Sequence, residues 1–323
     1  MKSYMKLIDV QSSDCAQSSD CGVVIKRTNN SYLIETGQGT LTCGLAGRLR
    51  NETRTDPVVI GDVVRWIEIG RETGQIVEVL PRRNQLARRS AVPMPTAHAH
   101  AQAIAANVDQ IVAVFAAANP RPKWNLLDRY LVSAEAADIP ALICLTKLDL
   151  VEGRPEAAEI HAVMAEYQAI GYPVILTSAV TGAGLNELDA ALRDRLSVFV
   201  GKSGVGKTSL LNALEPDLGL RVQETSQSTG KGRHTTTHFE IFSLASGGSI
   251  IDTPGLREFG LWNVEQDDLA LFFPEMRSLV GTCKFGLDCE HDQEPGCAIR
   301  RAVGMGAISP YRYQSYLKLK REP

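Results

Sequence analysis

Long apolar stretches are missing from this sequence of 323 residues. No run approaches the roughly 20 consecutive apolar residues that a membrane-spanning helix requires. The opening residues, Met1 to Tyr4, are not followed by the apolar segment of a secretory signal. These absences argue against a membrane protein and against a secreted one, so we expect a cytoplasmic protein without a membrane partner.

An excess of positive charge is missing as well. The formal net charge is −3, with 34 Lys and Arg against 37 Asp and Glu. Because nucleic-acid binding depends on clustered basic residues, any contact with RNA must come from local patches. The hydrophobic fraction of 44% is that of a globular chain, and the length leaves room for two or three domains.

Cysteines are few, and four of the seven are dispersed along the chain. Cys144 lies within the apolar run 141–145 and is expected to be an ordinary core residue. Cys15 and Cys21 each end a QSSDC repeat in a segment rich in Ser and Asp. Residues 1–20 are therefore predicted to form a flexible N-terminus.

Short β-rich runs separated by turn signals characterise residues 21–83, which are predicted to form a small barrel of the OB-fold type. The expected strands are residues 23–25, 32–34, 40–43, 63–67 and 75–80. Arginines make this region basic: Arg48, Arg50, Arg54, Arg65, Arg71, Arg82, Arg83, Arg88 and Arg89. An RNA-binding barrel is the favoured interpretation, and a barrel with a solvated arginine face is the alternative.

Residues 84–106 are interpreted as a linker, because their second half is dominated by Pro, Ala and His. From residue 107 the pattern changes to that of an α/β domain, which we expect to extend to residue 271. Apolar runs at 110–115, 141–145 and 174–176 predict buried parallel strands. Helical spacing predicts helices over 126–137 and 156–170.

A phosphate-binding loop matches the pattern G-x-x-x-x-G-K-[ST] in full, between a strand-like run at 197–200 and a helix-like run at 209–214. Its glycines allow backbone N–H groups to surround a β-phosphate at a helix N-terminus. Lys207 would neutralise the β- and γ-phosphate oxygens, and the Thr208 hydroxyl would ligate Mg²⁺. The nucleotide-binding residues expected here are Gly201, Lys202, Ser203, Gly204, Val205, Gly206, Lys207, Thr208 and Ser209.

A second nucleotide motif, Asp252-Thr253-Pro254-Gly255, directly follows an apolar strand end. Asp252 can hold Mg²⁺ through a water, and the Gly255 N–H can contact the γ-phosphate. Alone such a motif is more often a surface turn, but downstream of a phosphate loop it is predicted to be a nucleotide sensor.

A third motif, Thr146-Lys147-Leu148-Asp149, ends the strand predicted at 141–145 and is interpreted as the loop that recognises guanine. The Asp149 carboxylate can accept hydrogen bonds from guanine N1–H and the exocyclic amine, which adenine cannot supply. Lys147 would stack over the base. Thr146 stands where many GTPases have Asn, and because it can donate only one hydrogen bond we expect weakened nucleotide contacts. Thr177, Ser178 and Ala179 follow the next strand and are expected to meet guanine O6, so GTP is predicted over ATP.

The order of these motifs is unusual, because base recognition precedes the phosphate loop, which precedes the sensor. An ordinary GTPase begins with the phosphate loop and ends with base recognition. A domain whose termini lie close together can be rejoined and opened elsewhere without loss of its core. The order therefore predicts a circularly permuted GTPase domain.

A polar, Gly-containing segment at 231–238 lies between the phosphate loop and the sensor, as expected of a switch that orders around the γ-phosphate. One of its threonines should complete the Mg²⁺ shell. Leu256 follows Gly255 where many GTPases place a glutamine, and leucine cannot orient water. His234 is the candidate for that role; the alternative is a loop histidine without chemistry.

Four metal-ligating residues, Cys283, Cys289, His291 and Cys297, occur within a short segment rich in Gly, Asp and Glu. Three thiolates and one imidazole predict a closed tetrahedral structural zinc site, and disulfides are not expected in a reducing cytosol. Residues 272–323 are thus predicted to form an α-helical zinc-binding domain with a basic tail. The tail is either a solvated helix face or a phosphate-backbone contact; its basic residues are Arg300, Arg301, Arg312, Lys318, Lys320 and Arg321.

Taken together, the sequence resembles the bacterial small ribosomal subunit biogenesis GTPases of the RsgA (YjeQ) family. The resemblance rests on the barrel-like start, the permuted motif order, the string at 232–237, and the spacing of the three cysteines and the histidine. It implies a monomer that binds the small ribosomal subunit and its rRNA and hydrolyses GTP with Mg²⁺. It further implies that the particle stimulates hydrolysis, that hydrolysis is coupled to release, and that His234 is catalytic and Thr236 completes the Mg²⁺ shell. The alternative is a GTP-gated RNA-binding scaffold in which hydrolysis is incidental.

Overall fold

A five-stranded barrel forms the N-terminal domain of the computed structural model, which describes residues 20–28, 31–52, 58–89, 101–219, 240–252 and 264–322. The elements are β1 (Cys21–Arg27), β2 (Tyr32–Thr36), β3 (Gly39–Leu45), α2 (Gly47–Glu52), β4 (Val63–Gly70) and β5 (Thr73–Val79). The strands pair in the order β1-β2-β3-β5-β4, and β4 pairs again with β1, which closes the barrel. Val24, Ile34, Cys43, Val64 and Ile76 fill its interior. The five strands predicted from the sequence and the OB-fold are confirmed.

Two strands, β6 (Gln85–Arg89) and β7 (Ala101–Ala106), pair antiparallel between the barrel and the next domain. The linker prediction for 84–106 is therefore wrong for these residues. Leu86 and Ile104 are buried, and Ala105 forms a β-bridge with Ile60 of the barrel. The pairing of β6 with β7, which no local pattern in the sequence indicated, organises these residues.

Polar contacts hold the barrel against the α/β domain. Arg82 of the barrel side forms an ion pair with the buried Asp62 at 2.7 Å. Arg83 donates to Asp109 at 2.5 Å, and Asp109 in turn accepts a hydrogen bond from the Leu196 N–H at 2.7 Å. Of the arginines predicted to make a basic surface, Arg83 thus contributes to the joint between the domains, whereas Arg82 is paired within the barrel side.

A six-stranded sheet forms the core of the α/β domain. Its strands are β8 (Gln110–Ala116), β9 (Ala141–Thr146), β10 (Val174–Leu176), β11 (Leu196–Val200), β12 (Glu240–Ser243) and β13 (Ser249–Asp252). They lie in the order β10-β9-β8-β11-β13-β12, and all neighbours are parallel except β12 and β13. The three strands predicted within this domain are confirmed. β12 also pairs with β1, so the sheet is continuous with the barrel.

Helices cover both faces of this sheet: α3 (Trp124–Ala136), α4 (Pro155–Ile170), α5 (Leu185–Leu192) and α6 (Lys207–Leu214). Alternate residues of β8 point to opposite sides, as in any strand. Ile111 and Phe115 pack with the residues of α3 and α4, whereas Val112 and Val114 pack with those of α5 and α6. The two helices predicted from periodicity are confirmed as α3 and α4, and Cys144 is a buried core residue as predicted.

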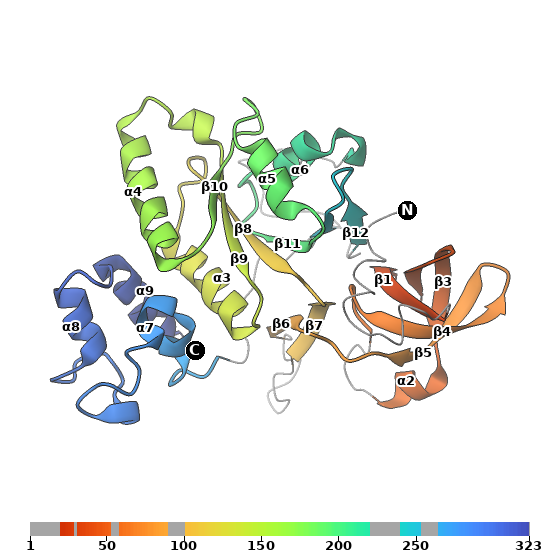
Figure 1. Ribbon diagram of the computed structural model, residues 1–323, viewed down its shortest axis with the longest axis horizontal. Coiled ribbons are helices and arrows are strands. Elements are labelled where there is room, and N and C mark those ends of the chain that lie inside the picture. The colour runs from red at the N-terminus through yellow and green to blue at the C-terminus, as the bar shows by residue number, and fades with distance from the viewer. Residues whose placement is uncertain are drawn as a thin grey trace, which may run out of the picture.

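The C-terminal domain is helical and lies at the end of the molecule opposite the barrel, with the α/β domain between them (Figure 1). Its helices are α7 (Pro274–Arg277), α8 (Ala298–Gly304) and α9 (Pro310–Lys320). Phe273, Met276, Ile299 and Tyr316 form its core together with the three clustered cysteines. Throughout the described ranges, no helix combines the length and the apolar character needed to cross a membrane.

One basic residue of the predicted tail is not on the surface. Arg312 of α9 is only 1% exposed, and its guanidinium forms ion pairs with Asp128 of α3 and with Glu275. Neither interpretation of the tail, a solvated face or a phosphate contact, applies to this residue. It packs the C-terminal domain against the α/β domain instead.

Candidate functional site

The phosphate loop joins the end of β11 to the start of α6, and all of its residues are described. Gly201 has φ +156°, and a Cβ at this position would lie 2.4 Å from the carbonyl oxygen of Val114 in the neighbouring strand. Gly206 has φ +96° and immediately precedes α6. The two glycines are therefore required by backbone conformation, and at Gly201 also by space.

Lys207 is the first residue of α6, and its ammonium folds back over the loop. It donates hydrogen bonds to the carbonyl oxygens of Gly201 at 2.5 Å and Lys202 at 2.9 Å. Lys202, Ser203 and Ser209 are exposed, so the loop faces solvent. A lysine ammonium beside the backbone N–H groups of such a loop is the arrangement that binds a di- or triphosphate.

Thr146 connects the loop predicted to recognise guanine to the phosphate loop. Its side chain is buried, and its hydroxyl donates a hydrogen bond to the carbonyl oxygen of Val205. The carbonyl oxygen of Phe115 lies 3.2 Å from the same hydroxyl. A single threonine proton thus ties the two loops together, and the predicted contact of Thr146 with a nucleotide stays a prediction.

Lys147 follows with φ +58° and reaches the phosphate loop as well. Its ammonium donates to the carbonyl oxygen of Gly204 at 2.6 Å and to that of Asn119, which lies after β8. Partial burial lowers the pKa of Lys147, and the nearby Asp149 carboxylate opposes that shift. Two carbonyl oxygens therefore fix the direction of the lysine stem, which would lie along a bound base.

Asp149 is oriented by Ser178, whose hydroxyl donates to one carboxylate oxygen at 2.5 Å. The Ser178 oxygen in turn accepts hydrogen bonds from the N–H groups of Val180 and Thr181, both at 3.2 Å. Thr177 is held to the end of β9 by a backbone hydrogen bond to Leu145 of 2.6 Å. The two motifs predicted to recognise guanine, 146–149 and 177–179, thus lie side by side at the carboxyl ends of β9 and β10.

Asp252 is the last residue of β13, the strand parallel to and adjacent to β11. Because Val198 of β11 pairs with Ile251, the backbone of Asp252 lies at the same sheet edge as the phosphate loop. Thr208, the other predicted Mg²⁺ ligand at this edge, is the second residue of α6. His234, Thr236 and Gly255 lie outside the described residues, so their roles stay predictions.

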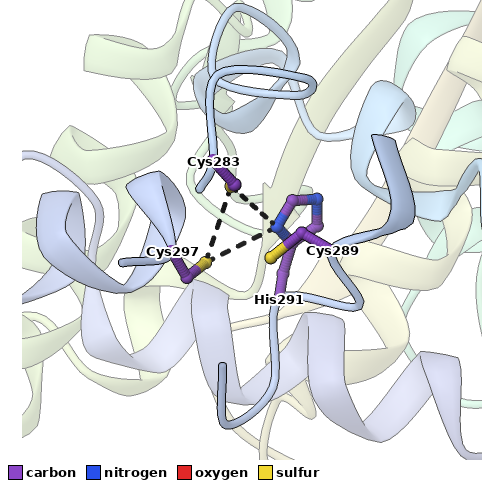
Figure 2. A group of neighbouring side chains, drawn as sticks. All are labelled: Cys283, Cys289, His291 and Cys297. Atoms are coloured by element: carbon purple, nitrogen blue, oxygen red, sulfur yellow. Dashed lines mark hydrogen bonds between the residues drawn. The ribbon is translucent and has the colours of Figure 1, made fainter. Parts of the chain in front are cut away.

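The four predicted metal ligands of the C-terminal domain are gathered at one point (Figure 2), where all are buried and their ligand atoms lie within 4.8 Å of one another. The His291 Nδ1 atom is 3.4 Å from the Cys283 sulfur and 3.5 Å from the Cys297 sulfur. The sulfurs of Cys283 and Cys297 are 3.9 Å apart. Zinc bound tetrahedrally by thiolates and an imidazole requires ligand atoms about 3.5–3.8 Å apart, so the cluster fits such an ion.

Backbone groups hold the ligands in place. The Ala298 N–H donates to the Cys283 sulfur at 3.2 Å, and the Arg300 N–H to the Cys297 sulfur at 3.5 Å. Burial raises the pKa of the Cys289 thiol to about 12, so a bound cation is what would stabilise its thiolate. Such N–H···S contacts and a fully protein-supplied shell are typical of a structural metal site.

Two contributors to the nucleotide site were missed from the sequence, namely the carbonyl oxygens of Phe115 and Asn119. Both are backbone atoms, so no pattern of side chains in the sequence indicates them. The sequence predicted strands at 110–115 and 141–145 but not that they are neighbours, and this pairing is what places the two oxygens near Thr146 and Lys147. Their role depends on the register between β8 and β9.

Comparison with known proteins identifies the family that the sequence motifs resemble. The family described as RsgA GTPase matches residues 79–262, which is more than half of the sequence. The Small ribosomal subunit biogenesis GTPase RsgA of Azotobacter vinelandii is 45% identical over 295 residues, covering 91% of this chain and 83% of that protein. The protein of the same name from Gemmatimonas aurantiaca is 44% identical over 309 residues, covering 94% and 98%.

Solved structures agree with these sequence relatives. The crystal structure of YjeQ from Thermotoga maritima superposes with a TM-score of 0.75 and 29% identity, covering 93% of this chain and 97% of that one. The structure of YloQ, a circularly permuted GTPase, gives a TM-score of 0.73 and 31% identity, covering 97% and 99%. With its barrel, permuted nucleotide loops and Cys₃His cluster, the chain belongs to the RsgA GTPase family.

Proposed function

We propose that this protein is a GTPase that binds the small ribosomal subunit and assists its late maturation. The observation that carries the GTPase part of the proposal is the hydrogen bond from Thr146 to Val205, supported by that from Lys147 to Gly204. These contacts unite a base-recognition loop and a phosphate loop that occur in reversed order in the sequence. The relatives from Azotobacter vinelandii and Gemmatimonas aurantiaca carry the name of a small-subunit biogenesis GTPase.

In the proposed site, the loop from Gly201 to Gly206 surrounds the β-phosphate with backbone N–H groups, and Lys207 neutralises the phosphate oxygens. Asp149, oriented by Ser178, accepts hydrogen bonds from the guanine edge. An adenine in this position would leave the carboxylate without its donors, and that loss discriminates strongly between the two nucleotides.

Hydrolysis in this proposal depends on residues at the same edge of the sheet. Thr208 and Asp252, together with Thr236, would hold Mg²⁺, which supplies charge neutralisation between the β- and γ-phosphates when bound. His234 orients the attacking water, the role that the leucine at position 256 cannot perform. Gly255 would contact the γ-phosphate through its N–H.

The Cys₃His cluster is proposed to hold one zinc ion in a structural role. The distances among the ligand atoms of Cys283, His291 and Cys297 match a tetrahedral shell, and Cys289 supplies the fourth ligand, so no position remains for a catalytic water. Its function is to keep the loops between the short helices of the C-terminal domain folded.

Contacts with rRNA are proposed for the barrel and the C-terminal domain, in a monomer that works in the cytoplasm. On the barrel, Arg48, Arg50 and Arg71 are exposed, whereas Arg82 pairs with the buried Asp62 and Arg83 pairs with Asp109 of the α/β domain. Arg300 and Arg301 are exposed on α8. Phosphate contacts from such clusters position a protein on RNA without reading its sequence.

The test is GTP turnover by the wild-type protein and by His234→Ala, with and without purified small ribosomal subunits. We expect turnover that is slow alone and rises on addition of the particle, and loss of that rise in the variant. No stimulation of the wild type would overturn the proposed role. If His234→Ala lost hydrolysis but was still released normally from the particle, the protein would be a GTP-gated RNA-binding scaffold.

A further inference from the structure

A buried ion-pair network joins the C-terminal domain to α3 of the nucleotide-binding domain. Arg312 donates to both carboxylate oxygens of Glu275, at 2.7 and 3.0 Å, and to Asp128. The Tyr167 hydroxyl of α4 donates to the same Asp128 oxygen at 2.6 Å. The guanidinium carbon lies 4.6 Å from the centre of the Phe273 ring. Although burial lowers the pKa of Arg312, the carboxylates more than offset it, so the charge is retained.

The helix that carries Arg312 also holds the backbone of the metal-binding segment. The Tyr313 hydroxyl donates to the His291 carbonyl oxygen at 2.7 Å, and the Tyr316 hydroxyl to that of Glu290 at 3.1 Å. Lys320 donates to the same Glu290 oxygen at 2.9 Å. The position of α9 is therefore coupled to the geometry of the Cys₃His cluster.

On its other side, α3 contacts the segment that supports the guanine-recognition loop. Tyr130 of α3 packs against Phe115 of β8, with ring centres 5.8 Å apart. The Phe115 carbonyl oxygen lies 3.2 Å from the Thr146 hydroxyl, and the Ala117 N–H donates to the Thr146 carbonyl oxygen at 2.8 Å. Between β8 and α3, the Asn119 carbonyl oxygen accepts a hydrogen bond from Lys147.

We propose that Arg312 is a positioning residue for guanine-nucleotide binding: by docking the C-terminal domain on α3, it sets the positions of the backbone carbonyls that hold Thr146 and Lys147. The inference rests on the proposed function, because it assumes that these two residues belong to a guanine site. The arrangement gives the C-terminal domain a direct means of altering how long nucleotide remains bound. Displacing α9 would move α3, and with it the Phe115 and Asn119 acceptors.

Two alternatives for the same network predict different behaviour. If Arg312 only stabilises the fold, its loss lowers the melting temperature and leaves nucleotide dissociation unchanged. If it acts through the guanine loop, its loss accelerates dissociation, and removal of Lys147 beforehand abolishes much of that effect. Residues acting through a shared contact are non-additive, whereas independent sites add.

The experiment measures dissociation of a fluorescent GDP analogue from the zinc-loaded full chain and from Arg312→Met, Arg312→Lys, Lys147→Ala and Arg312→Met/Lys147→Ala. Arg321→Ala is the matched control, since Arg321 lies at the end of the same helix in an exposed pair with Asp292. We expect about five- to tenfold faster dissociation from Arg312→Met, a size common for coupling between sites. The control should match the wild type.

The double variant tests whether Arg312 acts through Lys147, and Arg312→Lys tests whether faster dissociation could result from misfolding. Lys keeps the positive charge but cannot form the forked contact with Glu275, so we expect a smaller acceleration with full zinc content. In Lys147→Ala, the Arg312→Met change should accelerate dissociation by less than about twofold. Wild-type dissociation from both zinc-loaded Arg312 variants, or full additivity with Lys147→Ala, would overturn the inference. Failure of the wild type to bind GDP would instead overturn the proposed function.

Discussion

Replacing Thr146 by valine tests the contact that joins the two nucleotide loops. Valine has the shape of threonine, but a methyl group takes the place of the hydroxyl that donates to the Val205 carbonyl oxygen. Thr146 is 3% exposed, so water cannot replace the lost donor. A buried acceptor left without its hydrogen bond costs about 1–3 kcal/mol. If the nucleotide-bound form bears that whole cost, the Kd for GDP rises by about 5- to 150-fold.

The assay compares Thr146→Val with Thr146→Ser, which keeps the hydroxyl and loses a methyl group worth about 1 kcal/mol of burial. Nucleotide affinity is measured by titration calorimetry, and the free energy of unfolding by urea denaturation. We expect the valine variant to lose about 1–3 kcal/mol in total, divided between its binding free energy for GDP and its free energy of unfolding. The serine variant keeps the hydrogen bond and should lose only the burial of its methyl group. If the valine variant bound GDP as tightly as wild type and unfolded at the same urea concentration, the contact would have no energetic role.

Three further changes have defined outcomes. Gly201→Ala should abolish GDP binding, because its Cβ would lie 2.4 Å from the Val114 carbonyl oxygen. The control is Gly153→Ala, which has φ +74° and nothing within 4 Å of its Cβ, and should cost only about 1 kcal/mol of unfolding free energy. Equal effects of the two substitutions in binding and denaturation assays would refute the steric argument. Asp149→Ala should lower the preference for GTP over ATP by more than about tenfold in competition binding, and an unchanged preference would exclude its role in base recognition. Cys289→Ser should lower both the melting temperature and the zinc content, which mass spectrometry should find to be roughly one ion per chain in the wild type. Full zinc retention by the variant would show that Cys289 is not a ligand.

The barrel, the permuted α/β domain and the metal cluster could be predicted because each has a local signature. Short β-rich or apolar runs marked the strands, and the glycines and lysine of the phosphate loop have a fixed spacing. The four metal ligands are likewise close in sequence, so their spacing alone indicated a shared ion. In these cases the sequence signal lies within short segments, even where the contacts that complete the feature are long-range.

Features that depend on long-range contacts could not be predicted. The pairing of β6 with β7 brings Leu86 and Ala105 into register from opposite ends of a segment that resembles a linker. Arg312 was assigned to a basic tail, because its partners Asp128 and Glu275 are far away in sequence. Thr146 was expected to weaken nucleotide contacts, and its bond to Val205 became evident only from the pairing of β8 with both β9 and β11.

The measurement that tests the central claim most directly is the GTP turnover of the wild-type protein with increasing small ribosomal subunits, beside an equal series of large subunits. Lys207→Ala serves as the variant without phosphate binding. The account predicts that turnover rises to a plateau with small subunits only, and that Lys207→Ala shows no turnover in either series. Equal turnover with small subunits, large subunits and no particle would contradict it.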